Sequence, residues 1–178
     1  MQRKAQKIGD KRIHIFRMTT KPNIISILAL ICLTGFVAPQ DVRRPPPGRC
    51  RGGFSVRKAD QRTLTIGGKV GFQEVLTNTG GWSQSTNDFQ APCNGVYYFS
   101  FHAISPQNGD FTLALMKGRL YQVTAYGSKN DFQQGSNSVL LVLNAGEKVH
   151  LELQQGTIYE HPFNEAYTSF SGFLVEAF

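Results

Sequence analysis

Hydrophobic and polar residues alternate along most of the chain from residue 54 onward. In the segment KVHLELQ (148–154), three aliphatic residues occupy every second position and polar residues occupy the others. The segment GVYYFSFHA (95–103) alternates similarly, and FTLALM and SVLLVL are short apolar runs beside turn-forming sequences such as PQNGD and NAGEK. Short period-two segments separated by Gly- and Asn-rich turns predict an all-β sandwich or barrel.

The first 53 residues follow a different pattern and precede a globular domain predicted for residues 54–178. Residues 1–22 are a basic region, and residues 23–40 contain the uncharged run IISILALICLTGFVA. This run has the length of a signal-peptide hydrophobic region and is short for a membrane span. We expect a cleaved signal peptide, with an uncleaved signal-anchor as the alternative. Residues 41–53, DVRRPPPGRCRGG, are expected to form a stiff linker because consecutive prolines favour the polyproline II conformation.

The positive charge of the chain is concentrated ahead of the predicted domain. The formal net charge is +7, of which residues 1–22 contribute +6 and residues 23–53 contribute +3, so residues 54–178 carry −2. A nucleic-acid-binding protein would place basic residues on the folded domain. The distribution therefore argues against a nucleic-acid partner. It agrees with a basic region that stays cytosolic while the rest of the chain is exported, so we expect an extracellular, secreted protein.

The chain has three cysteines, and their positions suggest different roles. Cys32 lies in the apolar run and would leave with a cleaved signal. Cys50 lies in the linker, where a bridge between chains is accessible in an oxidising compartment, so it is a candidate interchain disulfide. Cys93 is interpreted as a buried, unreactive thiol, with a bridge to Cys50 as the alternative.

The sequence contains no recognisable catalytic motif. It lacks C-x-x-C, H-E-x-x-H, a phosphate-binding loop and G-x-S-x-G. Three histidines fall in the predicted domain, and none has an oriented partner visible in the sequence: His102, His150 and His161. We therefore predict that the chain is not an enzyme, and no cofactor is predicted with certainty.

Five motifs occur in a fixed order along the predicted domain: VGFQEVLTNTGG, DFQAPCNGVYYFSFHA, LALMKG, GSNSVLLVLNAGEKVHLEL and YTSFSGFLV. Together they resemble the C1q-type globular head of the C1q/TNF-like superfamily, as found in complement C1q, cerebellins and short collagen-less secreted proteins. The resemblance covers residues 53–178 and implies a ten-strand jelly-roll sandwich that assembles as a homotrimer. One departure is the turn after LALMK, where Gly118 follows directly and the family usually has Asn-Gly.

The resemblance also implies site residues. The last strand is expected to lie centrally in the inner sheet near the threefold axis, and Cys50 resembles cysteines that join cerebellin trimers. Some relatives bind calcium through acidic residues in the loop before the GSNS motif, which makes Asp131 a possible calcium ligand. Candidate core or subunit-contact residues are Tyr97, Phe99, Phe101, Phe170, Gly172 and Phe173. Candidate ligand-contacting residues in the polar loops are Trp82, Asn87, Asn108, Asp110, Lys129 and Asn130.

The function implied by the resemblance is recognition by binding. A trimer presents three copies of one surface, and such multivalency raises avidity without new contacts. We expect a secreted protein that binds glycan, microbial or cell-surface ligands in an innate-immune or lectin-like role. The alternative is a cerebellin-like or cytokine-like ligand of a cell-surface receptor, because a fold by itself does not fix the partner.

Overall fold

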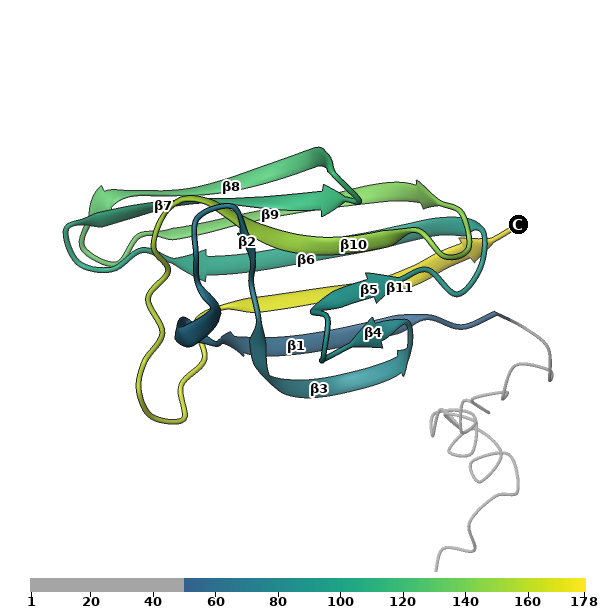
Figure 1. The fold of residues 1–178 in the computed structure, drawn as a ribbon, viewed down its shortest axis with the longest axis horizontal. Coiled ribbons are helices and arrows are strands. Elements are labelled where there is room, and N and C mark those ends of the chain that lie inside the picture. The colour runs from purple at the N-terminus through teal and green to yellow at the C-terminus, as the bar shows by residue number, and fades with distance from the viewer. Residues whose placement is uncertain (1–49) are drawn as a thin grey trace, which may run out of the picture. The chain divides into compact units, whose positions relative to one another are not determined.

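A computed structural model describes residues 50–178 and shows two β-sheets packed face to face (Figure 1). Every paired strand is antiparallel. The predicted all-β sandwich is confirmed. The predictions for residues 1–49, including the basic region, the signal segment and most of the linker, lie outside the described residues. Within residues 50–178, the structure contains no helix with the length and apolar character needed to cross a membrane.

The two sheets contain eleven strands, one more than the ten expected, and two of them, β2 and β4, are only two residues long. The five-stranded sheet has the order β3 (Phe72–Gly80), β1 (Gly53–Ala59), β11 (Ser169–Ala177), β6 (Gly95–Ile104) and β9 (Gln134–Leu143). The six-stranded sheet has the order β4 (Trp82–Ser83), β5 (Asp88–Gln90), β10 (Lys148–Gly156), β7 (Gly109–Lys117) and β8 (Leu120–Asn130), with β2 (Gly68–Lys69) paired to β10. A 3-10 turn, η1 (Gln61–Thr63), follows β1.

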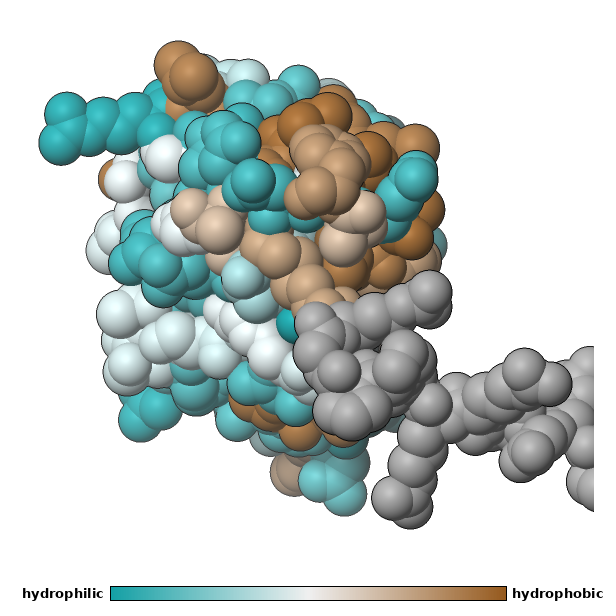
Figure 2. Space-filling view, turned by 90° about the vertical axis from the view of Figure 1, so that its right-hand side faces the viewer, coloured by the Kyte–Doolittle hydropathy of each residue, from teal (hydrophilic) through white to brown (hydrophobic). Residues whose placement is uncertain are grey.

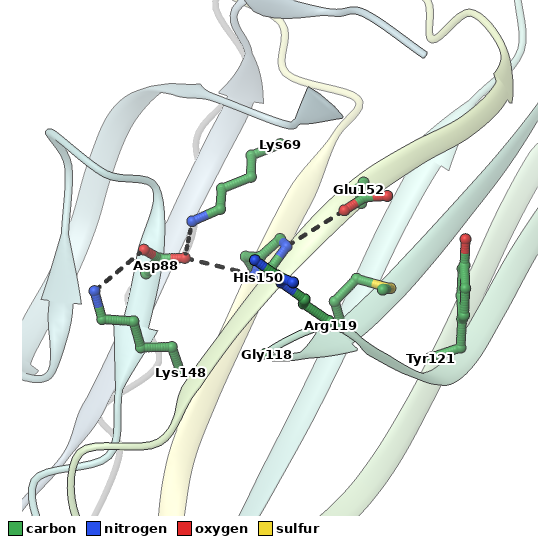
Figure 3. Close-up of a pocket in the computed structure, with 9 residues that line it drawn as sticks. Lys69, Asp88, Gly118, Arg119, Tyr121, Lys148, His150 and Glu152 are labelled. Atoms are coloured by element: carbon green, nitrogen blue, oxygen red, sulfur yellow. Dashed lines mark hydrogen bonds and ion pairs between the residues drawn. The ribbon is translucent and has the colours of Figure 1, made fainter. Parts of the chain in front are cut away.

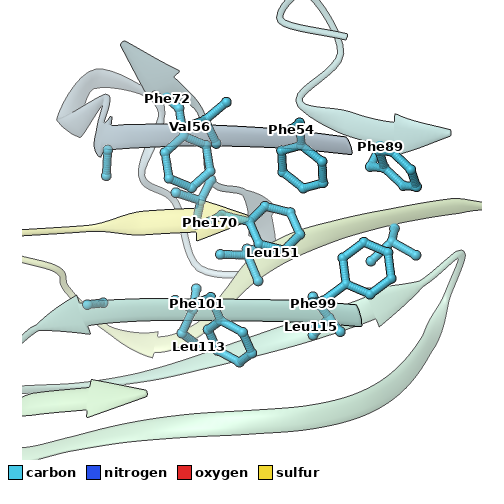
Figure 4. Packing of buried hydrophobic residues seen from close by; sticks show 14 of the residues in the cluster. Phe54, Val56, Phe72, Phe89, Phe99, Phe101, Leu113, Leu115, Leu151 and Phe170 are labelled. Atoms are coloured by element: carbon cyan, nitrogen blue, oxygen red, sulfur yellow. The ribbon is translucent and has the colours of Figure 1, made fainter. Parts of the chain in front are cut away.

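Aromatic rings fill much of the space between the sheets (Figure 4). The Phe54 ring is central: its centroid lies 4.7 Å from that of Trp82, 5.1 Å from that of Phe89 and 4.8 Å from that of Phe170. Alternate residues of β6 point into this core, as the period-two pattern predicted. The largest fully buried side chains are Tyr97, Phe89, Phe99, Phe101, Phe111, Phe170, Leu113, Leu115, Leu143, Leu151, Leu153 and Val56.

The last strand, β11, lies in the middle of the five-stranded sheet, between β1 and β6. Gly172 is opposite Phe54 on one neighbour and Phe99 on the other. A Cβ atom added to Gly172 would lie 2.4 Å from Phe99 Cδ1, so no other residue fits without displacing the ring. The first part of β11 therefore contributes Phe170 and Gly172 to the core, because residues 169–173 are paired on both edges.

Cys50 and Cys93 form a disulfide within the chain, with 6.2 Å between their Cα atoms. The prediction of an interchain bridge at Cys50 is therefore wrong, as is the interpretation of Cys93 as a free thiol. The physical reason is that the residues just before β1 already belong to the folded body. Gly52 packs against Pro92, and its carbonyl accepts a hydrogen bond of 2.8 Å from the Leu174 amide.

The long connection between β10 and β11, residues 157–168, is held by a buried carboxylate. Glu160 accepts hydrogen bonds from the backbone amides of Ala59, Tyr167 and Thr168, at 3.1, 3.1 and 2.7 Å. These bonds join the connection to β1 and satisfy three backbone donors near the core. The sequence analysis did not single out Glu160, because an isolated acidic residue between turn residues carries no pattern.

Candidate functional site

A pocket of about 530 Å³ lies on the outer face of the six-stranded sheet (Figure 3). Its residues come from β2, β5, β7, β8, β10 and the turn between β7 and β8. They are Lys69, Asp88, Met116, Gly118, Arg119, Tyr121, Lys148, His150 and Glu152. Seven of these nine residues are charged, histidine or tyrosine, so the lining of the pocket is predominantly polar.

The alternation of β10 explains why polar side chains gather here. The aliphatic residues of this strand face the core, so the polar residues between them face outward. Strand pairing then adds neighbours from both sides: Glu152 is opposite Lys69 on β2, and His150 is opposite Met116 on β7. The turn after β7 contributes Arg119.

Asp88 is the electrostatic centre of one side of the pocket. Its carboxylate is buried and lies 2.5 Å from Lys69 Nζ, 3.7 Å from Lys148 Nζ and 3.5 Å from His150 Nδ1 (Figure 3). A buried carboxylate requires compensating positive charge, because burial removes its hydration. The short contact to Lys69 supplies most of this compensation, so Lys148 is held more loosely.

His150 forms the floor of the pocket and is only 5% exposed. Burial is the largest cause that lowers the pKa of its imidazole, and the nearby charge of Lys69 lowers it further. Asp88 and Glu152 act in the opposite direction but do not reverse the shift. The ring is therefore neutral at pH 7, and its Nδ1 atom has no hydrogen-bond partner.

We expect the folded protein to lose stability on acidification through His150. The unfolded chain takes up this proton near pH 6.5, whereas the folded chain holds the group neutral to lower pH. The free energy of unfolding should therefore fall as the pH drops below about 6.5, with a slope of at most about 1.4 kcal/mol per pH unit from this group. Urea unfolding between pH 7.5 and 5 should show this slope in the native chain and in the His161→Gln control. If His150→Gln shows the same slope as the native chain, the pH dependence of stability does not come from His150.

The six residues predicted as core or subunit contacts separate into two groups. The rings of Tyr97, Phe99, Phe101 and Phe170 are fully buried between the sheets, and Gly172 is buried beside them. Phe173 is 51% exposed and points to the outer face of the five-stranded sheet. Within one chain, the first group is therefore core, and Phe173 alone is available for contact with another subunit.

The predicted ligand-contacting residues do not form one site. Trp82 is only 7% exposed and stacks on Phe54, so its prediction as a ligand-contacting residue is wrong. It is buried because the short strand β4 closes the edge of the sandwich over the aromatic core. Gly109 pairs with Asn130, which brings the start of β7 and the end of β8 together. The remaining candidates are Asn108, Asp110, Lys129 and Asn130 near this end, and Asn87 on a separate turn before β5.

Asp131 lies exposed in the turn between β8 and β9. No group of three or more His, Cys, Asp or Glu side chains is placed to hold a metal ion within residues 50–178 of a single chain. Calcium binding at Asp131 therefore stays a prediction.

The outer face of the five-stranded sheet carries a band of apolar residues. Phe173, Tyr98 and Leu140 are aligned across three neighbouring strands, and the rings of Phe173 and Tyr98 lie 5.5 Å apart. Leu140 is 59% exposed. Val142 and Val175 extend the band toward the C-terminal end of the molecule, where apolar surface gathers on one side (Figure 2). Contiguous exposed apolar surface of this kind marks an interaction site.

A two-sheet antiparallel sandwich whose last strand lies centrally in one sheet has the layout of a double-sheet jelly roll. The chain belongs to the C1q domain family: the family model for the C1q domain matches residues 53–175. The globular domain of zebrafish complement 1qA protein is 26% identical, with a TM-score of 0.59, over 72% of this chain and 99% of that chain. Murine APRIL shares the fold at 8% identity, with a TM-score of 0.52, over 71% of this chain and 100% of that chain.

Proposed function

We propose that this chain is an extracellular, multivalent recognition protein that binds glycan, microbial or cell-surface ligands as a homotrimer. The observation that carries the proposal is the apolar band on the outer face of the five-stranded sheet. Side chains such as Phe173 and Leu140 are about half exposed in a single chain. Burying the exposed half of each such side chain contributes roughly half of the value for full burial, on the order of 1 kcal/mol, so a subunit interface is the favourable arrangement for this face.

Membership of the C1q domain family supports the same proposal. Three copies arranged around a threefold axis would bury the apolar band and present three outward-facing copies of the six-stranded sheet. A ligand with repeated groups would then be held by several weak contacts at once. No catalytic step enters the proposed function, because binding alone accounts for the features described.

One argument for the alternative function, a cerebellin-like or cytokine-like signalling ligand, is contradicted by the structure. That argument took Cys50 as a link between chains, but both sulfur atoms of the Cys50–Cys93 pair are used within one chain. The likeness to murine APRIL extends to the fold alone. We therefore favour recognition of an extracellular ligand over signalling through a receptor.

We expect Phe173→Asp combined with Leu140→Asp to convert the trimer into monomers. A charged side chain at each of two aligned positions cannot be buried in an apolar interface without a large desolvation cost. Light scattering after size-exclusion chromatography should give three chain masses for the native protein and one for the variant. Ile66→Asp, at another exposed apolar residue, is the control and should leave the trimer intact. A native protein that is monomeric at micromolar concentration would contradict the proposal.

A further inference from the structure

We propose that the pocket on the outer face of the six-stranded sheet binds an acidic saccharide, whose carboxylate or sulfate group is held by Arg119 and Lys148 and whose sugar ring packs on Tyr121. This inference deepens the proposed function and rests on it, because it names the class of ligand that the recognition protein takes. Four observations carry it: the charge balance of the pocket, the position of Arg119, the buried His150 and the exposed ring of Tyr121.

The charge balance leaves positive charge at one edge of the pocket. Three cationic side chains line it against two carboxylates, with His150 neutral. Lys69 is the closest cation to Asp88, at 2.5 Å, and Glu152 accepts a hydrogen bond of 2.9 Å from Gln154. Lys148 lies 3.7 Å from Asp88, and among the ion pairs of residues 50–178 Arg119 has none. The pocket therefore carries one net positive charge, and Arg119 and the loosely paired Lys148 are the cations most available to an anionic ligand.

The turn between β7 and β8 carries Arg119 and lies against the backbone of Lys148 on β10. Lys117 pairs directly with Leu120, so Gly118 and Arg119 form a two-residue turn, with Gly118 at a φ of 59°. The Gly118 amide donates a hydrogen bond of 2.9 Å to the Lys148 carbonyl, which fixes the turn against β10. A guanidinium and an ammonium group on adjacent backbone suit an anionic group with several oxygen atoms.

The floor and the opposite wall fit the rest of a sugar. His150 is buried and forms the floor, with its Nδ1 atom 3.5 Å from the Asp88 carboxylate. Beside it, Glu152 is 3.6 Å from His150 Nε2 and presents a carboxylate that can accept bonds from sugar hydroxyls. Tyr121 is 61% exposed, and its hydroxyl donates a hydrogen bond of 2.6 Å to Gln154. This bond holds a flat apolar ring face at the rim, against which the C–H face of a pyranose can pack.

The location of the pocket also fits a recognition site. It lies on the sheet opposite the one that carries the apolar band, so the proposed trimer would leave three copies of it accessible. Weak affinity at each pocket would then be multiplied by avidity on a surface with repeated acidic sugars.

Calorimetric titration of the secreted native protein tests the inference with three probes: a heparin-derived tetrasaccharide, 3′-sialyllactose and lactose. We expect binding to at least one acidic probe and none to lactose, with affinity falling as the salt concentration rises. Binding of 3′-sialyllactose, which has a carboxylate and no sulfate, would show that a carboxylate is sufficient, whereas binding of the tetrasaccharide alone would point to sulfate. Equal binding of lactose, or binding of a poly-glutamate peptide as strong as that of the acidic saccharide, would overturn the proposal.

Single substitutions locate the site. Arg119→Ala and Lys148→Ala should each weaken saccharide binding by about tenfold, because each removes a charge-assisted hydrogen bond. Tyr121→Ala should weaken binding, and Tyr121→Phe, which keeps the ring, should weaken it less. Arg62→Ala removes a positive charge from an exposed residue that does not line the pocket, and it should leave binding unchanged. An equal loss of affinity in Arg62→Ala would show diffuse charge attraction and contradict the assignment of the site.

The trimer-disrupting variant separates this inference from the proposed function. In the Phe173→Asp, Leu140→Asp double variant, the affinity of a single pocket for the tetrasaccharide or sialyllactose should be unchanged, while binding to a glycan array should fall. If the native protein is monomeric but binds the acidic probe, the proposed trimer is wrong and the pocket remains the saccharide site. If array binding persists in Arg119→Ala and Lys148→Ala, the pocket is not the saccharide site, but the proposed recognition function is still supported.

Discussion

Replacing Cys50 and Cys93 together by serine is expected to lower the free energy of unfolding by about 4 kcal/mol. The disulfide joins residues separated by 43 positions, and closing a loop of this length restricts the unfolded chain by that amount in the chain-entropy description. In the folded protein the same bond holds the start of β1 against the turn before β6. The loss should therefore appear as a lower midpoint of guanidinium unfolding at equal protein concentration.

Two further measurements complete this test. The native chain should migrate as a single-chain species on a denaturing gel without reductant, since the cysteines are joined within the chain. Native protein unfolded in the presence of reductant is the matched control, and it should resemble the double variant. A disulfide-linked multimer on the gel, or a stability loss below about 1 kcal/mol, would contradict the intrachain assignment.

Replacing Phe170 by alanine should destabilise the domain by about 3–5 kcal/mol, the range for removing a buried aromatic side chain. The Phe170 ring is fully buried and contacts the rings of Phe54, Phe72, Trp82 and Phe99, so its removal leaves a cavity bordered by rigid rings. Such a cavity collapses poorly, because the surrounding rings also pack against one another. Thermal or guanidinium unfolding should measure the loss.

Two matched variants make the Phe170 result specific. Phe170→Leu refills part of the cavity and should lose less stability than Phe170→Ala. Phe163→Ala removes the same atoms from a ring that is exposed, and it should change the free energy of unfolding by less than about 0.5 kcal/mol. Equal losses in Phe170→Ala and Phe163→Ala would show that β11 does not contribute to the core as described.

Much of the fold could be predicted from the sequence because alternation is a local property. In segment 148–154, the aliphatic residues face the core and the polar residues face outward in β10, as their alternation predicted. Segment 95–103 likewise forms β6, with Tyr97, Phe99 and Phe101 pointing inward. The ordered motifs led to the C1q-type head, which the family match over residues 53–175 confirms. The two-residue strands β2 and β4 were not predicted, because two residues carry no periodicity.

The candidate site could not be predicted, because its residues are distant in the sequence. Lys69, Asp88, Arg119 and His150 come from four separate segments, and each looks like an ordinary surface residue in its own segment. The sequence analysis placed ligand contacts in polar loops, and Trp82 was among them. The structure buries Trp82 in the aromatic core and gathers charged side chains on a sheet face instead.

The sequence by itself determined the class of fold and the charge imbalance between the first 53 residues and the domain, because both follow from local composition and pattern. Only the tertiary structure decided that Cys50 pairs with Cys93, that Glu160 holds the last connection, and that Asp88 and His150 share a pocket. The physical reason is the same in each case. These contacts depend on strand order and register across two sheets, which are set by the packing of the whole core and not by any one segment.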